Sequence, residues 1–191
     1  PDAFICKVAD DQPELQVLEK TGSARMIPDQ IKIGPEPGSK ELLAYYQSWA
    51  GSKNVAQARQ ILQGMDSRAL SSDALAWREV YLGNLSLREE MRDDAIDHWL
   101  SAVSNSNDKP TLAAITAARS LGMSMIRRGE HSNAVKWFTW MQSAEIDSQS
   151  APLLAESAIC LGRYAQKDRD YPTAAGWYAK ARKLSQGTGD R

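Results

Sequence analysis

The feature that most constrains the fold of this chain is a spaced pattern of residues that occurs three times. Each copy has a Leu-Gly pair, an Ala 12 positions after the Gly, an aromatic residue four positions after the Ala, and a small or flexible residue three positions later. Successive copies are 39 and then 40 residues apart. Because the three copies agree in their internal spacing, they indicate a tandem repeat. The copies are Leu82-Gly83, Ala95, Trp99 and Ala102; Leu121-Gly122, Ala134, Phe138 and Met141; and Leu161-Gly162, Ala174, Tyr178 and Ala181.

The residue types in this pattern predict pairs of closely packed helices. A Gly costs about 1 kcal/mol in a helix interior, so three at equivalent positions need a packing reason. We expect each Gly to lie on a first helix where a second helix crosses it, with the Ala as the other half of the contact. The aromatic and the last residue lie on the same helix face as the Ala. We expect them to fill the space between one hairpin and the next.

From Glu41 onward the apolar periodicity is helical, and no strand competes with it. The predicted fold class is therefore all-α, with short connections that make neighbouring helices antiparallel. The eight predicted helices cover residues 42–49, 55–65, 73 to about 89, 93–103, 110–128, 131 to about 144, 152–167 and 172–185.

Helix boundaries carry local signals. Three segments put a capping residue just before a Pro suited to the first helical turn: Asp108-Lys109-Pro110, Ser150-Ala151-Pro152 and Asp170-Tyr171-Pro172. Gly129 and Gly187 stand where helices should end.

Two domains are expected, an irregular N-terminal arm or linker over 1–40 and a helical repeat domain over 41–191. Besides Pro1, the arm holds four Pro and three Gly, a density that repeatedly breaks helices. Residues 41–65 are interpreted as a fourth, degenerate hairpin, because Gln60 stands where an aromatic residue belongs.

The repeat resembles the tetratricopeptide repeat (TPR), whose pattern is Leu-Gly on the first helix, then Ala and an aromatic on the second. The resemblance covers about 73–185. This chain departs from the family in its longer period, since the family period is about 34 residues. Ser86, Met125 and Ala165 replace the family's aromatic on the first helix, and the closing Pro is absent. The resemblance implies stacked hairpins in an α-solenoid, three clear and one degenerate.

The resemblance also implies a function, a scaffold for protein–protein interaction and complex assembly, with a peptide or partner subunit held in a concave groove lined by the first helices. Arg119, Arg127, Arg163 and Lys167 would form a basic strip there, which suits an acidic or C-terminal-carboxylate peptide because Arg grips carboxylates bidentately. The alternative is that these are solvated side chains on an exposed face. The candidate partner-binding residues are Trp77, Asn84, Arg88, Arg119, Met123, Arg127, Arg163 and Lys167.

Charge and hydropathy exclude some function classes. The formal net charge is −1, which argues against a nucleic-acid binder that works by general phosphate neutralisation. No apolar run approaches 18 residues, so no membrane span is predicted. The chain begins at Pro1 rather than Met, and we expect a processed chain or a piece of a longer one. The compartment stays open, cytoplasmic or, for a processed chain, periplasmic.

Catalytic and metal-binding patterns are not found in the sequence, so no enzyme activity and no cofactor is predicted. His98 and Asp94 form an i, i+4 pair, but further His or Cys ligands are missing nearby. Cys6 and Cys160 could be bridged or could be buried thiols. The acidic cluster Glu89, Glu90, Asp93, Asp94 and Asp97 is interpreted as complementing a helix dipole, with a patch for a metal or a basic partner as the alternative.

Some alternatives remain open at this point. A chaperone or assembly factor could hold a secreted or unfolded client in the same groove, and the scaffold could form a homo-oligomer. Trp137 and Trp140 flank the repeat residue Phe138. Trp140, which is off the repeat register, could pack on a neighbouring hairpin or be exposed for a partner.

Overall fold

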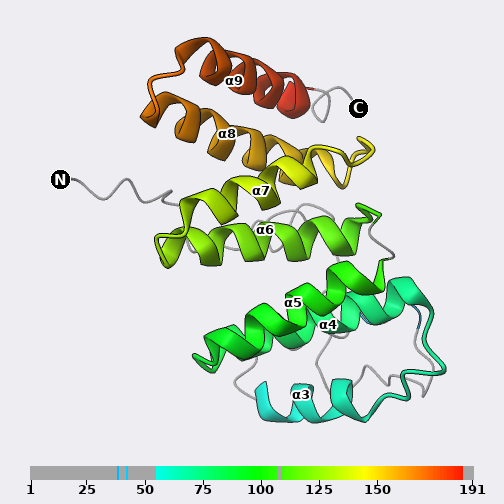
Figure 1. Ribbon diagram of the computed structural model, residues 1–191. Helices are drawn as coiled ribbons and strands as arrows, with labels where there is room; N and C mark the ends of the chain where they lie inside the picture. Colours follow the sequence, from blue (N-terminus) through cyan, green and yellow to red (C-terminus); the bar gives the residue numbers. More distant parts are fainter. Residues whose placement is uncertain (1–37, 39–41, 43–54, 107–108, 187–191) are drawn as a thin grey trace.

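A computed structural model describes residues 38, 42, 55–106 and 109–186 of the chain. Within these residues it has seven helices and no strand (Figure 1), which confirms the predicted all-α class. The expected arm lies outside the described residues apart from Gly38. The first predicted helix also lies outside them apart from Leu42, which is helical and buried. The helices are α3 (Val55–Gly64), α4 (Ser72–Arg88), α5 (Arg92–Asn105), α6 (Leu112–Arg127), α7 (His131–Met141), α8 (Ala151–Lys167) and α9 (Tyr171–Gln186).

The helices pair into hairpins α4–α5, α6–α7 and α8–α9, which stack one on another, and α3 packs against α4 (Figure 1). The first helices α4, α6 and α8 form one layer, in which α6 contacts both α4 and α8. The second helices α5, α7 and α9 form the other layer, in which no two helices contact each other. The stack therefore curves with the first helices on its inner side. We call these the inner layer and the outer layer.

The repeated glycines lie under the repeated aromatic rings. A Cβ atom placed on Gly83 would be 2.5 Å from the Trp99 ring, and a Cβ on Gly122 would be 2.6 Å from the ring of Phe138. At Gly162 the same atom would lie 2.7 Å from the ring of Tyr178. The predicted close approach is confirmed, but each aromatic covers the glycine of its own hairpin. The ring, and not the Ala that we expected, is thus the nearest neighbour of the glycine, because it occupies the volume that the glycine leaves open.

The start of α6 and the hydrogen bonds before α8 differ from prediction. Pro110 lies before α6, whose cap is Thr111, since the Thr111 hydroxyl accepts a hydrogen bond from the Ala114 N–H at 3.3 Å. Before α8, the Asp147 carboxylate accepts from the Ser150 N–H at 2.6 Å, and the Ser150 hydroxyl accepts from the Asp147 N–H at 2.9 Å. This is a reciprocal capping box.

The core consists of two buried clusters. One lies among α3, α4, α5 and the start of α6, and the other among α6, α7, α8 and α9. Three partly buried side chains pack against both clusters, those of Met125, Trp137 and Trp140. They therefore lie at the junction between successive hairpins.

Candidate functional site

A row of basic residues runs along one edge of the inner layer. Arg88, Arg127 and Lys167 are the last residues of α4, α6 and α8, and the repeat spaces them 39 and 40 positions apart. All three side chains are exposed. None has an ion pair or hydrogen bond within the described part of the chain. We call these three residues the basic row.

The next equivalent positions toward the centre of the inner layer are Asn84, Met123 and Arg163. Asn84 is partly buried, and its side-chain oxygen accepts a hydrogen bond from the Trp99 indole at 3.3 Å. Met123 is buried, with 8% of its surface exposed. Arg163 is exposed and adds a third cation near the ends of α6 and α8.

Arg119 is held by an acidic partner from the neighbouring hairpin. Its Nε and Nη2 atoms donate to the two carboxylate oxygens of Glu156 at 2.5 and 3.0 Å. The pair joins α6 to α8 across the inner layer. Arg119 thus lies on the predicted face, but its charge is already matched, because the stacking brings the Glu156 position of the next repeat within reach.

Trp77 belongs mainly to the packing of α4. Its ring stacks on Tyr81 with centroids 5.4 Å apart and an interplanar angle of 25°. The side chain is partly buried against the first core cluster. Of the eight candidate residues, the structure therefore leaves four exposed cations on the inner layer, those of Arg88, Arg127, Arg163 and Lys167.

A buried ion-pair network joins α4 to α5. One Glu79 carboxylate oxygen lies 2.9 Å from Nη2 of Arg78, and the other lies 2.7 Å from Nδ1 of His98. Burial alone raises the pKa of Glu79, but hydrogen bonds and charge from His98 and Arg78 outweigh it and lower the pKa below its ordinary value. His98 is thus engaged by Glu79, and no cluster of potential metal ligands is present among the residues that the structure describes.

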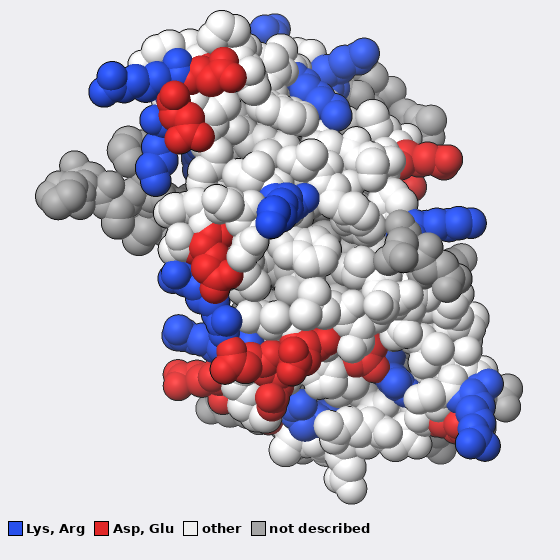
Figure 2. Space-filling view, in the orientation of Figure 1, with Lys and Arg blue, Asp and Glu red and all other residues white. Residues whose placement is uncertain are grey.

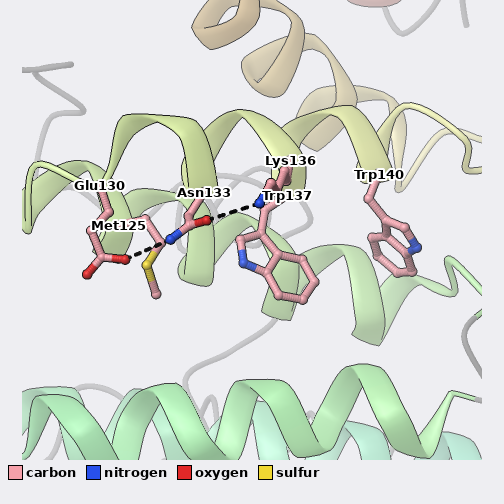
Figure 3. Close-up of a pocket in the computed structure, with 6 residues that line it drawn as sticks. All are labelled: Met125, Glu130, Asn133, Lys136, Trp137 and Trp140. Atoms are coloured by element: carbon pink, nitrogen blue, oxygen red, sulfur yellow. Dashed lines mark hydrogen bonds between the residues drawn. The ribbon is translucent and has the colours of Figure 1, made fainter.

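A groove on the outer side of the molecule was not predicted as a site. It has a volume of about 420 Å³ and lies along α7 and the end of α6 (Figure 3). The signal in the sequence was the pair of tryptophans beside Phe138, of which Trp140 is off the repeat register. The residues that line the groove are Met125, Glu130, Asn133, Lys136, Trp137 and Trp140.

Charged side chains are unevenly placed around this groove. In Figure 2 acidic side chains gather over α5, and the surface above them, over α6 and α7, is mostly uncharged. Part of the acidic cluster is paired, since Glu89 bonds Arg59 at 2.6 Å and Asp93 bonds Arg128. Asp93 and Asp94 lie in the first turn of α5, where they complement the helix dipole as expected.

Comparison with known proteins establishes the fold of this chain and does not assign it to a family. No family model and no curated protein is similar in sequence. The crystal structure of MamA is similar in shape, with a TM-score of 0.58 over 94% of this chain and 96% of that one. The fold is a tetratricopeptide-like helical solenoid. The two sequences are 16% identical, so the likeness concerns the fold alone.

The resemblance read from the three repeated patterns is thus confirmed at the level of fold. Each pattern corresponds to one observed hairpin, from α4–α5 to α8–α9. Over the described residues, no helix is long and apolar enough to cross a membrane.

Proposed function

We propose that this protein is a non-enzymatic scaffold that binds an acidic segment of a partner protein along the basic row of the inner layer. The observation that carries the proposal is the register of Arg88, Arg127 and Lys167. The repeat puts one exposed cation at the same place on each first helix. Solenoids commonly bind partners along such an extended inner surface, and a TPR-like fold is consistent with a protein partner.

The spacing of the basic row defines the kind of ligand that fits. Packed helices lie about 8–10 Å apart, so neighbouring cations of the row are separated by about that distance. An extended peptide advances about 3.3 Å per residue. An acidic residue at every third position would therefore meet successive cations. Arg127 and Arg88 can each bind a carboxylate bidentately, whereas Lys167 acts as a point charge.

The proposal is tested by affinity capture with the wild-type chain and with a variant carrying Arg88→Glu, Arg127→Glu and Lys167→Glu. We expect the variant to lose acidic partners that the wild type recovers, and we expect wild-type capture to weaken as salt is raised. Arg119 is left unchanged in this design because its substitution would unpair Glu156.

The matched control is Arg182→Glu, which changes the charge of an exposed residue on α9, outside the inner layer. A cation in the last turn of a helix can also stabilise that helix through the dipole. A lower melting temperature with unchanged partner recovery would assign the basic row to that structural role and would refute the proposed binding site.

A further inference from the structure

The groove on the outer side lies along α7, on the side of this helix that faces the end of α6. The backbones of α5 and α7 do not come within 8 Å of each other between Cα atoms, and α6 packs against both helices. Trp137 and Trp140 both project from the same side of α7 (Figure 3). Their rings meet edge to face, with centroids 6.4 Å apart. Met125 of α6 completes the apolar part of the lining.

The repeat does not require a tryptophan at the position of Trp140. The equivalent positions one repeat earlier and one repeat later hold Ser101 and Lys180, whereas those of Trp137 hold His98 and Trp177. α5 and α9 form the same kind of hairpin with a polar residue at the Trp140 position, so the fold tolerates such side chains there. Both Trp137 and Trp140 are only partly buried. Partly exposed tryptophans are typical anchors of protein interfaces.

The residues that line the groove come from α6, α7 and the turn between them, and the acidic surface of α5 lies beside it (Figure 2). Asp93 bonds Arg128 at the end of α6, so this face of α5 turns toward α6 and the start of α7. Asp97 and Leu100 follow Asp93 by four and seven positions and share that face. Leu100 is 42% exposed, and the exposed Asp97 carboxylate has no hydrogen-bond or ion-pair partner among the described residues.

The rim on α7 holds its charges in fixed positions. The side-chain amide of Asn133 donates to Glu130 at 3.0 Å, and its oxygen accepts from Lys136 at 3.5 Å. Within the lining, Lys136 balances Glu130, while Arg128 is matched by Asp93. The groove therefore combines an apolar lining with a neighbouring negatively charged surface on α5.

We infer that this groove is a second docking surface, which binds a peptide segment of a partner protein that carries a bulky apolar side chain next to Lys or Arg. The apolar side chain would lie against Trp137 and Trp140, and the cation would face Asp97 and Glu130. A volume of about 420 Å³ is within the usual range of about 300–1,000 Å³ for ligand sites. This surface differs from the basic row in the charge that it selects.

The test is selection from a displayed library of random peptides. The library is first depleted on a double variant with Trp140→Ala and Asp97→Lys, and then selected on the wild-type chain. We expect the recovered peptides to pair an aromatic or large aliphatic residue with Lys or Arg. Fluorescence anisotropy with a labelled, recovered peptide then measures the affinity of each single variant.

We expect Trp140→Ala and Asp97→Lys each to weaken binding about tenfold or more. Thr139→Ala, an exposed change on the same helix, should leave the affinity unchanged. The triple variant of the basic row should bind the same peptide like the wild type, which separates failure of this inference from failure of the proposed function. Asp97→Lys serves as the second probe if Trp140→Ala lowers the folded fraction, because Asp97 is exposed.

Three results would overturn the inference. They are no enrichment after depletion, recovered peptides without basic residues, and equal affinity for the wild type and for Asp97→Lys. A wild-type dimer in sedimentation that Trp140→Ala converts to a monomer would also overturn it, because the occupant of the groove would then be a second copy of this chain.

Discussion

At the scale of single residues, Gly122 gives the most direct test of the repeat register. A Cβ at this position would lie 2.6 Å from the buried Phe138 ring. Overpacking of this kind costs about 1–3 kcal/mol, and the upper part of that range exceeds the gain of about 1 kcal/mol that Ala has over Gly in a helix. We expect Gly122→Ala to lower the free energy of unfolding by up to about 2 kcal/mol, measured by denaturant titration.

Gly176 is the matched control for this prediction. It also lies inside a helix, but a Cβ there would have no neighbour within 4 Å. Gly176→Ala should therefore stabilise the protein by about 0.5–1 kcal/mol. Equal effects of the two substitutions would mean that Phe138 does not cover Gly122 in solution.

Glu79 makes stability depend on pH at the acid end. The folded pKa of this carboxyl is lowered below its ordinary value of 4.5 by His98 and Arg78 despite burial. A group with a lowered folded pKa stabilises the protein above its ordinary pKa, and this contribution is lost as pH falls through the folded pKa. We expect Glu79→Gln to reduce stability at pH 7 and to flatten the loss of stability below pH of about 4.5.

Thermal melting of both proteins between neutral and acid pH checks the Glu79 prediction. The exposed pair of Asp93 and Arg128 supplies the comparison, with side-chain exposures of 86% and 39%. Exposed ion pairs contribute little to stability. In Asp93→Asn, the melting temperature should therefore fall with decreasing pH nearly as it does in the wild type. If stability falls as steeply at acid pH in Glu79→Gln as in the wild type, the network of Glu79 with His98 and Arg78 does not control this pH dependence.

At the scale of helices, the sequence predicts the segments well and their first turns less well. α7 begins at the predicted residue, and α4, α5, α8 and α9 begin within one residue of prediction, because their apolar faces follow the helical period through to the core. The errors fall where two capping residues compete. Ser150 is the N-cap residue of α8 as predicted, but its side chain makes no capping hydrogen bond into α8, and Asp147 instead accepts from the Ser150 N–H one turn earlier. Spacing alone does not distinguish these arrangements, since both residues are good caps.

The candidate site likewise contains some features that the sequence predicts and others that it does not. Exposed cations at helix ends, such as Arg127 and Lys167, follow from the repeat alone. The pairing of Arg119 with Glu156 and the burial of Met123 do not, because both depend on how one hairpin sits on the next. The outer groove along α7 and the end of α6 could not be predicted for the same reason. Only the side-by-side tryptophans, Trp137 and Trp140, pointed to it.

At the scale of the whole molecule, stability should be distributed between hairpins and the interfaces that join them. The Arg119–Glu156 pair crosses one such interface, from α6 to α8, with side-chain exposures of 19% and 25%. Its two parallel hydrogen bonds fix the relative position of the helices. The pair is thus a local measure of how firmly the last hairpin is held to the one before it.

A double-mutant cycle with Arg119→Ala and Glu156→Ala measures this coupling. Because the pair is bidentate and mostly shielded from water, we expect a coupling energy of about 1–2 kcal/mol, above the range of up to about 1 kcal/mol for exposed pairs. Hydrogen exchange should show faster opening of α8 and α9 in either single variant, while the amides of α4 stay protected. The same cycle on Asp93 and Arg128 should give a smaller coupling, because both partners are more exposed. Equal coupling energies in the two cycles, or uniform loss of protection along the chain, would show that the solenoid unfolds as one unit that this pair does not control.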